Sequence, residues 1–256
     1  SEYGVDTNPR FHSYTPQVQD YSEEYQLLFH DNALRAIEER AYVLGGYVWN
    51  MFDFGSANRK EGGEIGKNLK GLVTIDRKLK KDAFYLYKAY WSKEPFVYLA
   101  GKRFVHRHEE KNDIVILSNL RSFRVFVDDE LLTEIKTDRA MTVIKDVRLT
   151  LGAHKICVEG TDDHGVSRKD ELQLLRVNEA DSGYIHVKEE AAKPAVNWFE
   201  TYDLSNVENV VLKDGYFSTF DTIEALYAHE QAKAVFLKYF AYATNHPIFE
   251  VTMGVM

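Results

Sequence analysis

The side chains that could do chemistry gather in a polar loop directly after a short apolar run. The run, Tyr47 to Trp49, follows two glycines, a pattern typical of a buried strand. The loop behind it carries five glycines between Gly55 and Gly71. Its polar side chains are Asn50, Asp53, Asn58, Arg59, Glu61, Asn68 and Lys70. A buried strand that opens into such a loop is typical of a site at the carboxyl end of an α/β strand. The alternative is a solvated loop beside a core tryptophan.

Six short motifs within residues 1–95 carry a family resemblance. In chain order they are Ser1 to Gly4, Ser22 to Gln26, Trp49 to Phe54, Asn68 to Val73, Asp76 to Lys78, and Lys81 to Ala89. Their order and spacing resemble the last quarter of the catalytic barrel of glycoside hydrolase family 2, which includes β-galactosidases and β-glucuronidases. The resemblance implies that residues 1–95 are the last part of a (β/α)8 TIM barrel. It also implies that the chain is the C-terminal part of a longer enzyme.

The resemblance assigns the nucleophile of a retaining exo-glycosidase to Glu2, at the end of the seventh barrel strand. Such an enzyme needs a carboxylate beneath the anomeric carbon, about 5–5.5 Å from a second carboxylic acid that serves as acid and then base. The second group would be a glutamate outside this chain, so we expect the chain alone to be inactive. Without the resemblance, a glutamate at this place would be read as an ordinary solvated residue.

The resemblance further implies three substrate-binding residues. Trp49 would form a wall of the sugar pocket, the alternative being a core tryptophan. Asn68 and Lys70 match an Asn-x-Lys pair with which family glucuronidases hold the substrate carboxylate, although Lys70 could instead brace a loop carboxylate such as Glu61. The loop from Gly55 to Gly63 resembles the galactosidase branch. The first prediction is therefore a β-galactosidase, and the second is a β-glucuronidase in which Asn68 and Lys70 bind the sugar carboxylate.

Two helices should position these residues. Asp20 predicts a helix N-terminus, with Glu23 completing a capping box, and the helix should run to about Tyr42. Its predicted buried stripe is Tyr25, Leu28, Phe29, Ala33, Ala36 and Ile37, opposite a solvated charged face that includes Asp31. A second helix should begin at Lys81-Asp82. Asp53 is expected to brace the loop rather than to contact the sugar.

The rest of the chain divides into two further regions. Short strand-like runs at 96–99, 113–117, 123–127, 141–144 and 156–158, separated by turn residues, predict an immunoglobulin-like β-sandwich over residues 96–178. Residues 179–256 read as a mostly helical module, with a capping box at Ser218 to Asp221 and an apolar stripe interrupted near His229. The predicted fold class is thus multidomain α/β plus all-β: a barrel portion over 1–95, the sandwich, and the small helical module.

Composition limits the classes of partner. The net charge of −8 argues against nucleic acid, and no apolar run approaches the roughly 20 residues of a membrane helix. The single cysteine, Cys157, cannot form an internal disulfide, which fits a cytoplasmic location. His106, His108 and Glu109 lack the further ligand that zinc needs. We therefore predict no cofactor in this chain, although the full-length enzyme could hold Mg²⁺ elsewhere.

The expected partners are a β-galactoside or β-glucuronide substrate, the remainder of the same enzyme, and in a homo-oligomer a second copy. A hypothesis from another class remains open beside these. Because the catalytic residues are incomplete, the chain could be a non-catalytic sugar-binding or structural module.

Overall fold

The computed structural model describes residues 2–162, 165–187, 216–217 and 221–244. The chain forms two compact units, residues 1–188 and residues 189–256. The predicted boundaries after residues 95 and 178 stay predictions. The sequence also predicts a short charged, alanine-rich link at 188–193 and an aromatic anchor for the last region at 197–199, and both lie outside the described residues.

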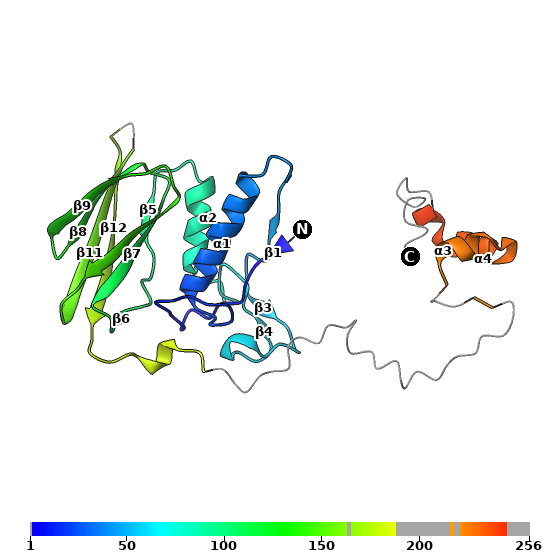
Figure 1. Cartoon of the computed structure of the whole chain (residues 1–256), viewed down its shortest axis with the longest axis horizontal. Coiled ribbons are helices and arrows are strands. Elements are labelled where there is room, and N and C mark those ends of the chain that lie inside the picture. Colours follow the sequence, from blue (N-terminus) through cyan, green and yellow to red (C-terminus); the bar gives the residue numbers. More distant parts are fainter. Residues whose placement is uncertain (1, 163–164, 188–215, 218–220, 245–256) are drawn as a thin grey trace. The chain divides into compact units, whose positions relative to one another are not determined.

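A short parallel strand pair with a helix between its strands opens the first unit. β1 (Glu2–Tyr3) pairs in parallel with β2 (Tyr47–Val48), and α1 (Glu23–Glu38) lies between them in the chain. A helical crossover is the usual way to join parallel neighbours. α2 (Asp82–Trp91) begins where the sequence predicts and lies beside α1 (Figure 1).

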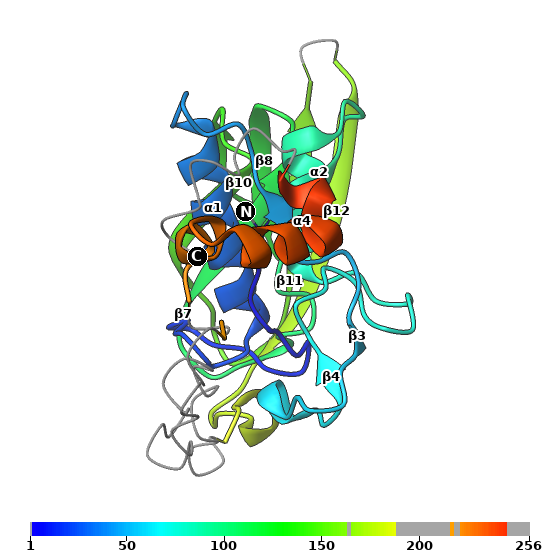
Figure 2. The same ribbon diagram turned by 90° about the vertical axis from the view of Figure 1, so that its right-hand side faces the viewer.

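The loop that follows β2 contains a small antiparallel pair of its own, apart from the larger sheets (Figure 2). Its elements are β3 (Phe54–Gly55), a 3-10 turn η1 (Glu61–Gly63) and β4 (Lys67–Asn68). Phe54 lies opposite Asn68 in this pair. The loop is therefore a folded hairpin rather than an irregular solvated segment.

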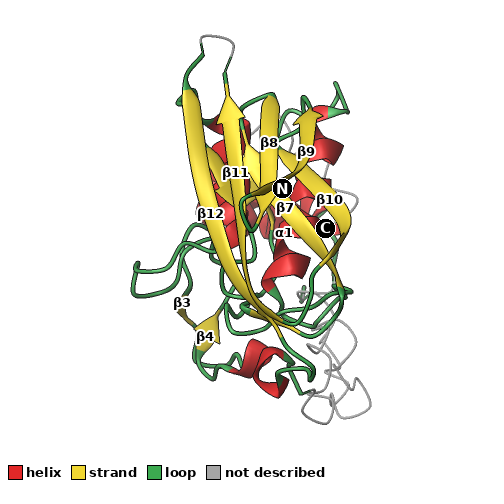
Figure 3. Cartoon of the chain, turned by 90° about the vertical axis from the view of Figure 1, so that its left-hand side faces the viewer, coloured by secondary structure: helices red, strands yellow, loops and turns green. Residues whose placement is uncertain are grey.

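Eight strands build two sheets in the second half of this unit (Figure 3). They are β5 (Val97–Leu99), β6 (His106–Arg107), β7 (Lys111–Ser118), β8 (Ser122–Val127), β9 (Glu130–Lys136), β10 (Met141–Arg148), β11 (Gly152–Thr161) and β12 (Ser167–Arg176). One sheet has the order β10-β7-β5 and the other β6-β12-β11-β8-β9, all antiparallel except β12 with β6. A 3-10 turn, η2 (Ser182–Tyr184), follows.

The three-stranded sheet is covered on both faces. Successive side chains of a strand point to opposite sides, and each side joins a different core. Val97 and Leu99 of β5 join the core between the two sheets, with Ile156 and Leu172 of the facing sheet. Phe96, Tyr98 and Ala100, which alternate with them, pack instead against α1 and α2 in a second core that includes Leu86. Packing is thus continuous across residue 95, and helices, small sheet and large sheet form three layers (Figure 1).

The ends of α1 differ from the prediction. Ser22 is the N-cap, and its side chain accepts a hydrogen bond from the Tyr25 N–H. The predicted cap, Asp20, instead accepts from the N–H groups of Gln17 and Ser22 in the preceding turn, so its carboxylate is already engaged. The helix stops at Glu38 rather than near Tyr42.

The buried face of α1 is also not the one predicted. The buried positions are Glu23, Gln26, Leu27, His30, Asp31 and Leu34, whereas Leu28 is exposed. Asp31 was expected on a solvated face, yet it accepts a hydrogen bond from the Tyr90 hydroxyl of α2. Polar side chains can occupy this helix–helix interface because partners on neighbouring elements satisfy their hydrogen bonds.

His30 gives this interface a measurable pH dependence. Its imidazole is fully buried, and its Nδ1 lies 2.8 Å from the Tyr87 hydroxyl. Burial, with a smaller contribution from the positive charge of Lys81, lowers the pKa of His30 to about 4. Between pH 6.5 and 4 the unfolded histidine binds a proton that the folded one does not. His30 therefore costs stability as pH falls through that window, by up to about 1.4 kcal/mol per pH unit.

We expect the variant His30→Gln to lack this contribution. The slope of its unfolding free energy against pH should be smaller than that of the parent between pH 6.5 and 4, measured by urea denaturation. His108→Gln, which removes a half-exposed histidine, is the matched control. Equal slopes in the parent and in His30→Gln would contradict a neutral buried imidazole.

The described part of the second unit consists of two helices, α3 (Ile223–Tyr227) and α4 (Glu230–Thr244). Thr222 caps α3 by accepting from the Ala225 N–H. Residues 218–220 of the predicted capping box lie outside the described residues, and Thr222 provides the observed cap. The break between the helices falls at Ala228 and His229, where the predicted apolar stripe is interrupted.

Candidate functional site

The carboxyl ends of β1 and β2 bring the predicted nucleophile and the predicted sugar wall onto adjacent backbones. Glu2 lies opposite Tyr47, Tyr3 lies opposite Val48, and the Trp49 N–H donates to the Tyr3 carbonyl at 2.7 Å. The Glu2 side chain is exposed, and Trp49 retains 39% of its accessible surface. Neither side chain belongs to a closed core, so both can reach a molecule outside the protein.

Gly4 explains how closely these two strand ends approach. A Cβ atom at this position would lie only 1.8 Å from the Trp49 carbonyl oxygen. Any side chain would therefore force the backbones apart, which is a known reason for glycine at a close approach.

The segment that carries Asn68 and Lys70 lies beside the same strand ends. The Asn50 N–H donates to the Lys70 carbonyl at 3.2 Å, and the Leu72 N–H donates back to the Asn50 carbonyl at 3.0 Å. Asn68 is buried, and its Oδ1 accepts from the Lys70 N–H at 3.1 Å. All four predicted site residues thus belong to three hydrogen-bonded neighbouring segments.

The polar ends of Asn68 and Lys70 are available for a ligand. Within the described ranges, the Lys70 ammonium makes no ion pair and the Asn68 Nδ2 donates to no protein group. Glu61, the carboxylate that Lys70 could have braced, pairs instead with Arg59 at 3.2 Å. Lys70 also lines a small cavity of about 250 Å³ with Gly4 and Tyr25.

Asp6 ties this segment to β1, and sequence reasoning missed it. One carboxylate oxygen of Asp6 accepts from the Leu69 N–H at 3.0 Å, and the other accepts from Arg59 at 2.7 Å. The Thr7 N–H donates to the Leu69 carbonyl at 3.0 Å. Leu69, between Asn68 and Lys70, is therefore hydrogen-bonded through both its backbone N–H and its backbone carbonyl. The only signal in the sequence was the position of Asp6, four residues after Glu2.

Asp53 braces the loop through buried hydrogen bonds, as the sequence predicts. It is buried, and its Oδ1 accepts from the Gly71 N–H at 2.8 Å and from the Lys81 ammonium at 2.9 Å. Lys81 is fully buried and donates as well to the carbonyls of Thr7 and Leu69, both at 2.8 Å. Burial raises the pKa of Asp53 and lowers the pKa of Lys81, while their mutual attraction opposes both shifts.

A second buried ionic cluster joins α1, α2 and the sandwich. Arg103 binds the carboxylates of Glu23 on α1 and Asp82 on α2, both almost fully buried. The Asp82 carboxylate also accepts from the Tyr98 hydroxyl at 3.0 Å and from the Gly101 N–H at 2.6 Å. Burial and the negative charge of Asp82 raise the pKa of Glu23 to about 7. Sequence reasoning assigned Glu23 to a capping box, which this cluster replaces.

The described residues contain no group of three or more His, Cys, Asp or Glu side chains arranged to hold a metal ion. His106 instead pairs with Asp181 at 2.9 Å, and the His108 ring packs against Tyr14. No helix within the described ranges is long and apolar enough to cross a membrane. The chemistry offered here is therefore that of one carboxylate, one indole, an amide and an ammonium around an exposed strand end.

Comparison with known proteins connects this arrangement to sugar chemistry. No family model matches the chain. A β-glucuronidase of Bacteroides fragilis is 44% identical over 140 residues, which are 54% of this chain and 20% of that protein. The chain therefore spans about a fifth of the length of this curated relative.

Two solved structures share the fold. The crystal structure of an FMN-binding β-glucuronidase from Facaelibacterium prausnitzii L2-6 matches with a TM-score of 0.66 and 41% identity, covering 73% of this chain and 28% of that one. Bacteroides uniformis β-glucuronidase 2, covalently bound to cyclophellitol-6-carboxylate aziridine, matches with a TM-score of 0.62 and 29% identity, covering 69% and 22%. These similarities support a glycosidase relationship and favour the glucuronidase alternative over the predicted galactosidase.

Proposed function

We propose, from the homology of this chain to part of the β-glucuronidases of glycoside hydrolase family 2, that it supplies part of the active site of a retaining β-glucuronidase. The prediction of a β-galactosidase is replaced by this alternative, because the relatives described above are β-glucuronidases. In this proposal β1, α1, β2 and α2 belong to the last part of a (β/α)8 barrel, and the two sheets form an immunoglobulin-like sandwich.

One observation carries the choice of a carboxylate-bearing sugar. The Asn68 Nδ2 and the Lys70 ammonium have no partner among the described residues, and the Lys70 N–H fixes the orientation of the Asn68 amide by donating to its Oδ1. Nearby cations are already neutralised: Arg59 pairs with Asp6, and Lys67 pairs with Glu64. A carboxylate placed between Asn68 and Lys70 would receive charge-assisted hydrogen bonds, which are the stronger kind.

The proposed reaction gives each residue a distinct role. Glu2 attacks the anomeric carbon and forms a covalent glycosyl ester, while a carboxylic acid from another segment protonates the leaving oxygen. That second group then removes a proton from water, which hydrolyses the ester with net retention. Trp49 lies against the apolar face of the sugar and limits its position. Asn68 and Lys70 select glucuronides over sugars that lack the carboxylate.

The remaining expectations are part of the same proposal. The described residues offer no cluster of metal ligands, and in this proposal any Mg²⁺ of the whole enzyme is held by other segments. A homo-oligomer and a cytoplasmic location stay predictions. The hypothesis of a non-catalytic sugar-binding module predicts binding of a glucuronide without turnover, which the same assays detect.

The substrate assignment is tested by Lys70→Ala in an enzyme that contains this chain together with the other segments of its relatives. We expect kcat/KM for 4-nitrophenyl β-D-glucuronide to fall about tenfold to hundredfold, the equivalent of one charge-assisted hydrogen bond. Activity on the corresponding glucoside and galactoside, which have no carboxylate, should change little. Lys67→Ala, on the same loop but paired with Glu64, is the matched control and should leave the glucuronide rate unchanged.

Two outcomes would count against the proposal. Equal losses on all three sugars would show that Lys70 supports the loop and does not read the carboxylate. An intact, folded parent that turns over none of them would favour the non-catalytic module.

A further inference from the structure

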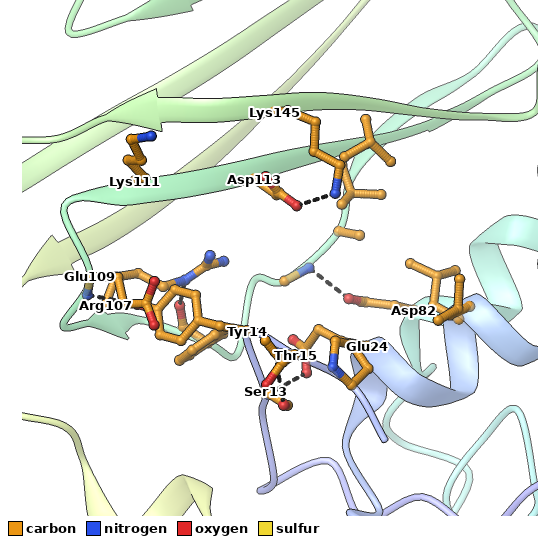
Figure 4. Close-up of a pocket in the computed structure, with 18 of the residues that line it drawn as sticks. Ser13, Tyr14, Thr15, Glu24, Asp82, Arg107, Glu109, Lys111, Asp113 and Lys145 are labelled. Carbon is orange, nitrogen blue, oxygen red and sulfur yellow. Dashed lines mark hydrogen bonds and ion pairs between the residues drawn. The ribbon is translucent and has the colours of Figure 1, made fainter. Parts of the chain in front are cut away.

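A second cavity lies on the other side of α1, between that helix and the outer face of the three-stranded sheet. It has a volume of about 400 Å³, and its walls come from the loop at residues 13–16, from α1, from residues 100–109 and from β7 and β10. Small-molecule sites in proteins usually enclose about 300–1,000 Å³. None of the proposed sugar-site residues lines this cavity. Figure 4 shows its polar side chains.

Arg107 is the unusual group in its wall. The side chain is 5% exposed, and its guanidinium points into the space between Tyr14 and Asp113 (Figure 4). Its Nε donates to the Phe104 carbonyl at 2.7 Å, and its Nη1 reaches Asn112 only at 3.5 Å. The guanidinium also lies over the Phe104 ring, 4.2 Å from its centre. No carboxylate of the described residues forms an ion pair with it. Buried charges are normally paired, so this cation lacks an expected partner.

Four of the five carboxylates that line the cavity bind other groups, and the fifth, on the exposed Glu109, forms no ion pair with Arg107 within the described residues. Glu24 accepts from His12 and from the Ser13 N–H, and Asp113 pairs with Lys145. The carboxylate of Asp82 binds Arg103 and the Gly101 N–H, as described above. Burial lowers the pKa of Arg107, although the negative charge of Glu24 opposes the shift. Lys111 pairs with Asp146 and Lys145 with Asp113, so Arg107 is the lining cation that has no carboxylate partner in the described part of the chain.

Gly101 makes room for that charge. It has a φ of +80°, and a Cβ atom there would lie 2.8 Å from the Arg107 Nη2. A side chain at this position would meet the guanidinium, and the backbone conformation itself favours glycine. The Nη2 group is thus left beside open space, with no hydrogen-bond partner among the described residues.

Apolar side chains form another part of the lining. Leu27 of α1, Val115 of β7, and Met141 and Val143 of β10 all line the cavity. Phe104 also lines the cavity, and its ring continues the apolar surface as far as the Arg107 guanidinium. A ligand that fits these walls needs an apolar body and one anionic end. We propose that this cavity binds a small aromatic or aliphatic carboxylic acid, with its carboxylate on Arg107 and its apolar body against β7 and β10.

The proposal is tested on the 256-residue chain with two probes of the same shape. Calorimetric titration at pH 7.5 compares 2-naphthoate with its neutral analogue 2-naphthamide. We expect the carboxylate to bind about tenfold to hundredfold more tightly, as one charge-assisted hydrogen bond would provide. Arg107→Gln should remove this difference, and Arg148→Gln, at an exposed arginine paired with Glu110, should preserve it.

A second variant keeps the test decisive if Arg107→Gln does not fold. Val143→Phe leaves Arg107 in place and fills the apolar wall, so both probes should lose binding. The proposal is overturned if the two probes bind equally to the parent, if Val143→Phe binds 2-naphthoate as the parent does, or if the parent shows no binding at millimolar concentration. These results do not depend on glycosidase activity.

Discussion

Replacing Glu2 by glutamine is expected to reduce kcat for a β-glucuronide by about 10⁴- to 10⁶-fold. Hydrolases lose activity on this scale when the nucleophile, or a residue that activates it, is removed. The amide has nearly the shape of the carboxylate but cannot attack the anomeric carbon as an anion. Glu2 is the first residue of β1, beside β2, and its side chain is exposed, so the substitution should disturb little packing. Turnover of 4-nitrophenyl β-D-glucuronide by the longer enzyme measures the loss.

Two further measurements separate a nucleophile from a residue that only supports the fold. Cyclophellitol-6-carboxylate aziridine, which is bound covalently in the Bacteroides uniformis relative, should modify the Glu2 peptide of the parent and leave Glu2→Gln unmodified. Azide should partly restore activity to Glu2→Ala, because the small anion can enter the vacated space and attack the sugar. Glu39→Gln, at an exposed residue after α1, should behave like the parent. Covalent modification at another residue would exclude Glu2 as the nucleophile.

Replacing Lys81 by methionine is expected to lower the free energy of unfolding by about 3–5 kcal/mol, the usual effect of removing one partner of a buried ion pair. Lys81 is fully buried and donates to Asp53 and to the carbonyls of Thr7 and Leu69. Methionine fills similar space but leaves the Asp53 carboxylate and two carbonyls without this donor. Urea denaturation of the chain measures the loss, with Lys78→Met at an exposed neighbour as the control.

The double variant Lys81→Met/Asp53→Asn tests the cause of that loss. Asparagine can still accept from the Gly71 N–H through its Oδ1, but it carries no charge. The double variant should therefore be more stable than Lys81→Met alone, because the uncompensated charge has gone. If it is less stable, the loss comes from packing or from the two carbonyls. A Lys81→Met protein as stable as the parent would show that the buried ammonium is dispensable.

The sequence predicted those parts of this site whose residues lie in short, continuous motifs. Glu2, Trp49, Asn68 and Lys70 stand in short motifs, and the structure gives them adjacent backbones. Asp53 was expected to brace the loop, and it does so through the Gly71 N–H. The roles of these residues in catalysis and binding stay predictions.

The parts that sequence reasoning missed depend on contacts between distant segments. Lys81 and Asp53 are 28 residues apart, and Arg103 and Glu23 are 80 apart. A charged residue read alone is assigned to the surface, because burial without a partner is costly. The same rule placed Asp31 on a solvated face of α1, although the Tyr90 hydroxyl makes its burial acceptable.

Strands with polar sequences were missed for a related reason. β9 and β12 carry mostly exposed or half-exposed side chains, so they lack the apolar runs that revealed β7 and β8. β9 forms one edge of the five-stranded sheet, and β12 pairs along its whole length with β11. Their identity as strands comes from backbone pairing with neighbours, which a single sequence does not display.

The close approach at Gly4 has a consequence for protein engineering. Since no other amino acid fits against the Trp49 carbonyl oxygen, the separation of the two strand ends is fixed by the backbone and cannot be tuned by substitution at this point. Libraries intended to broaden the accepted sugars should leave position 4 unrandomised and diversify exposed positions such as Trp49. Selection would then sample new pocket shapes without spending library members on chains whose first strand can no longer dock.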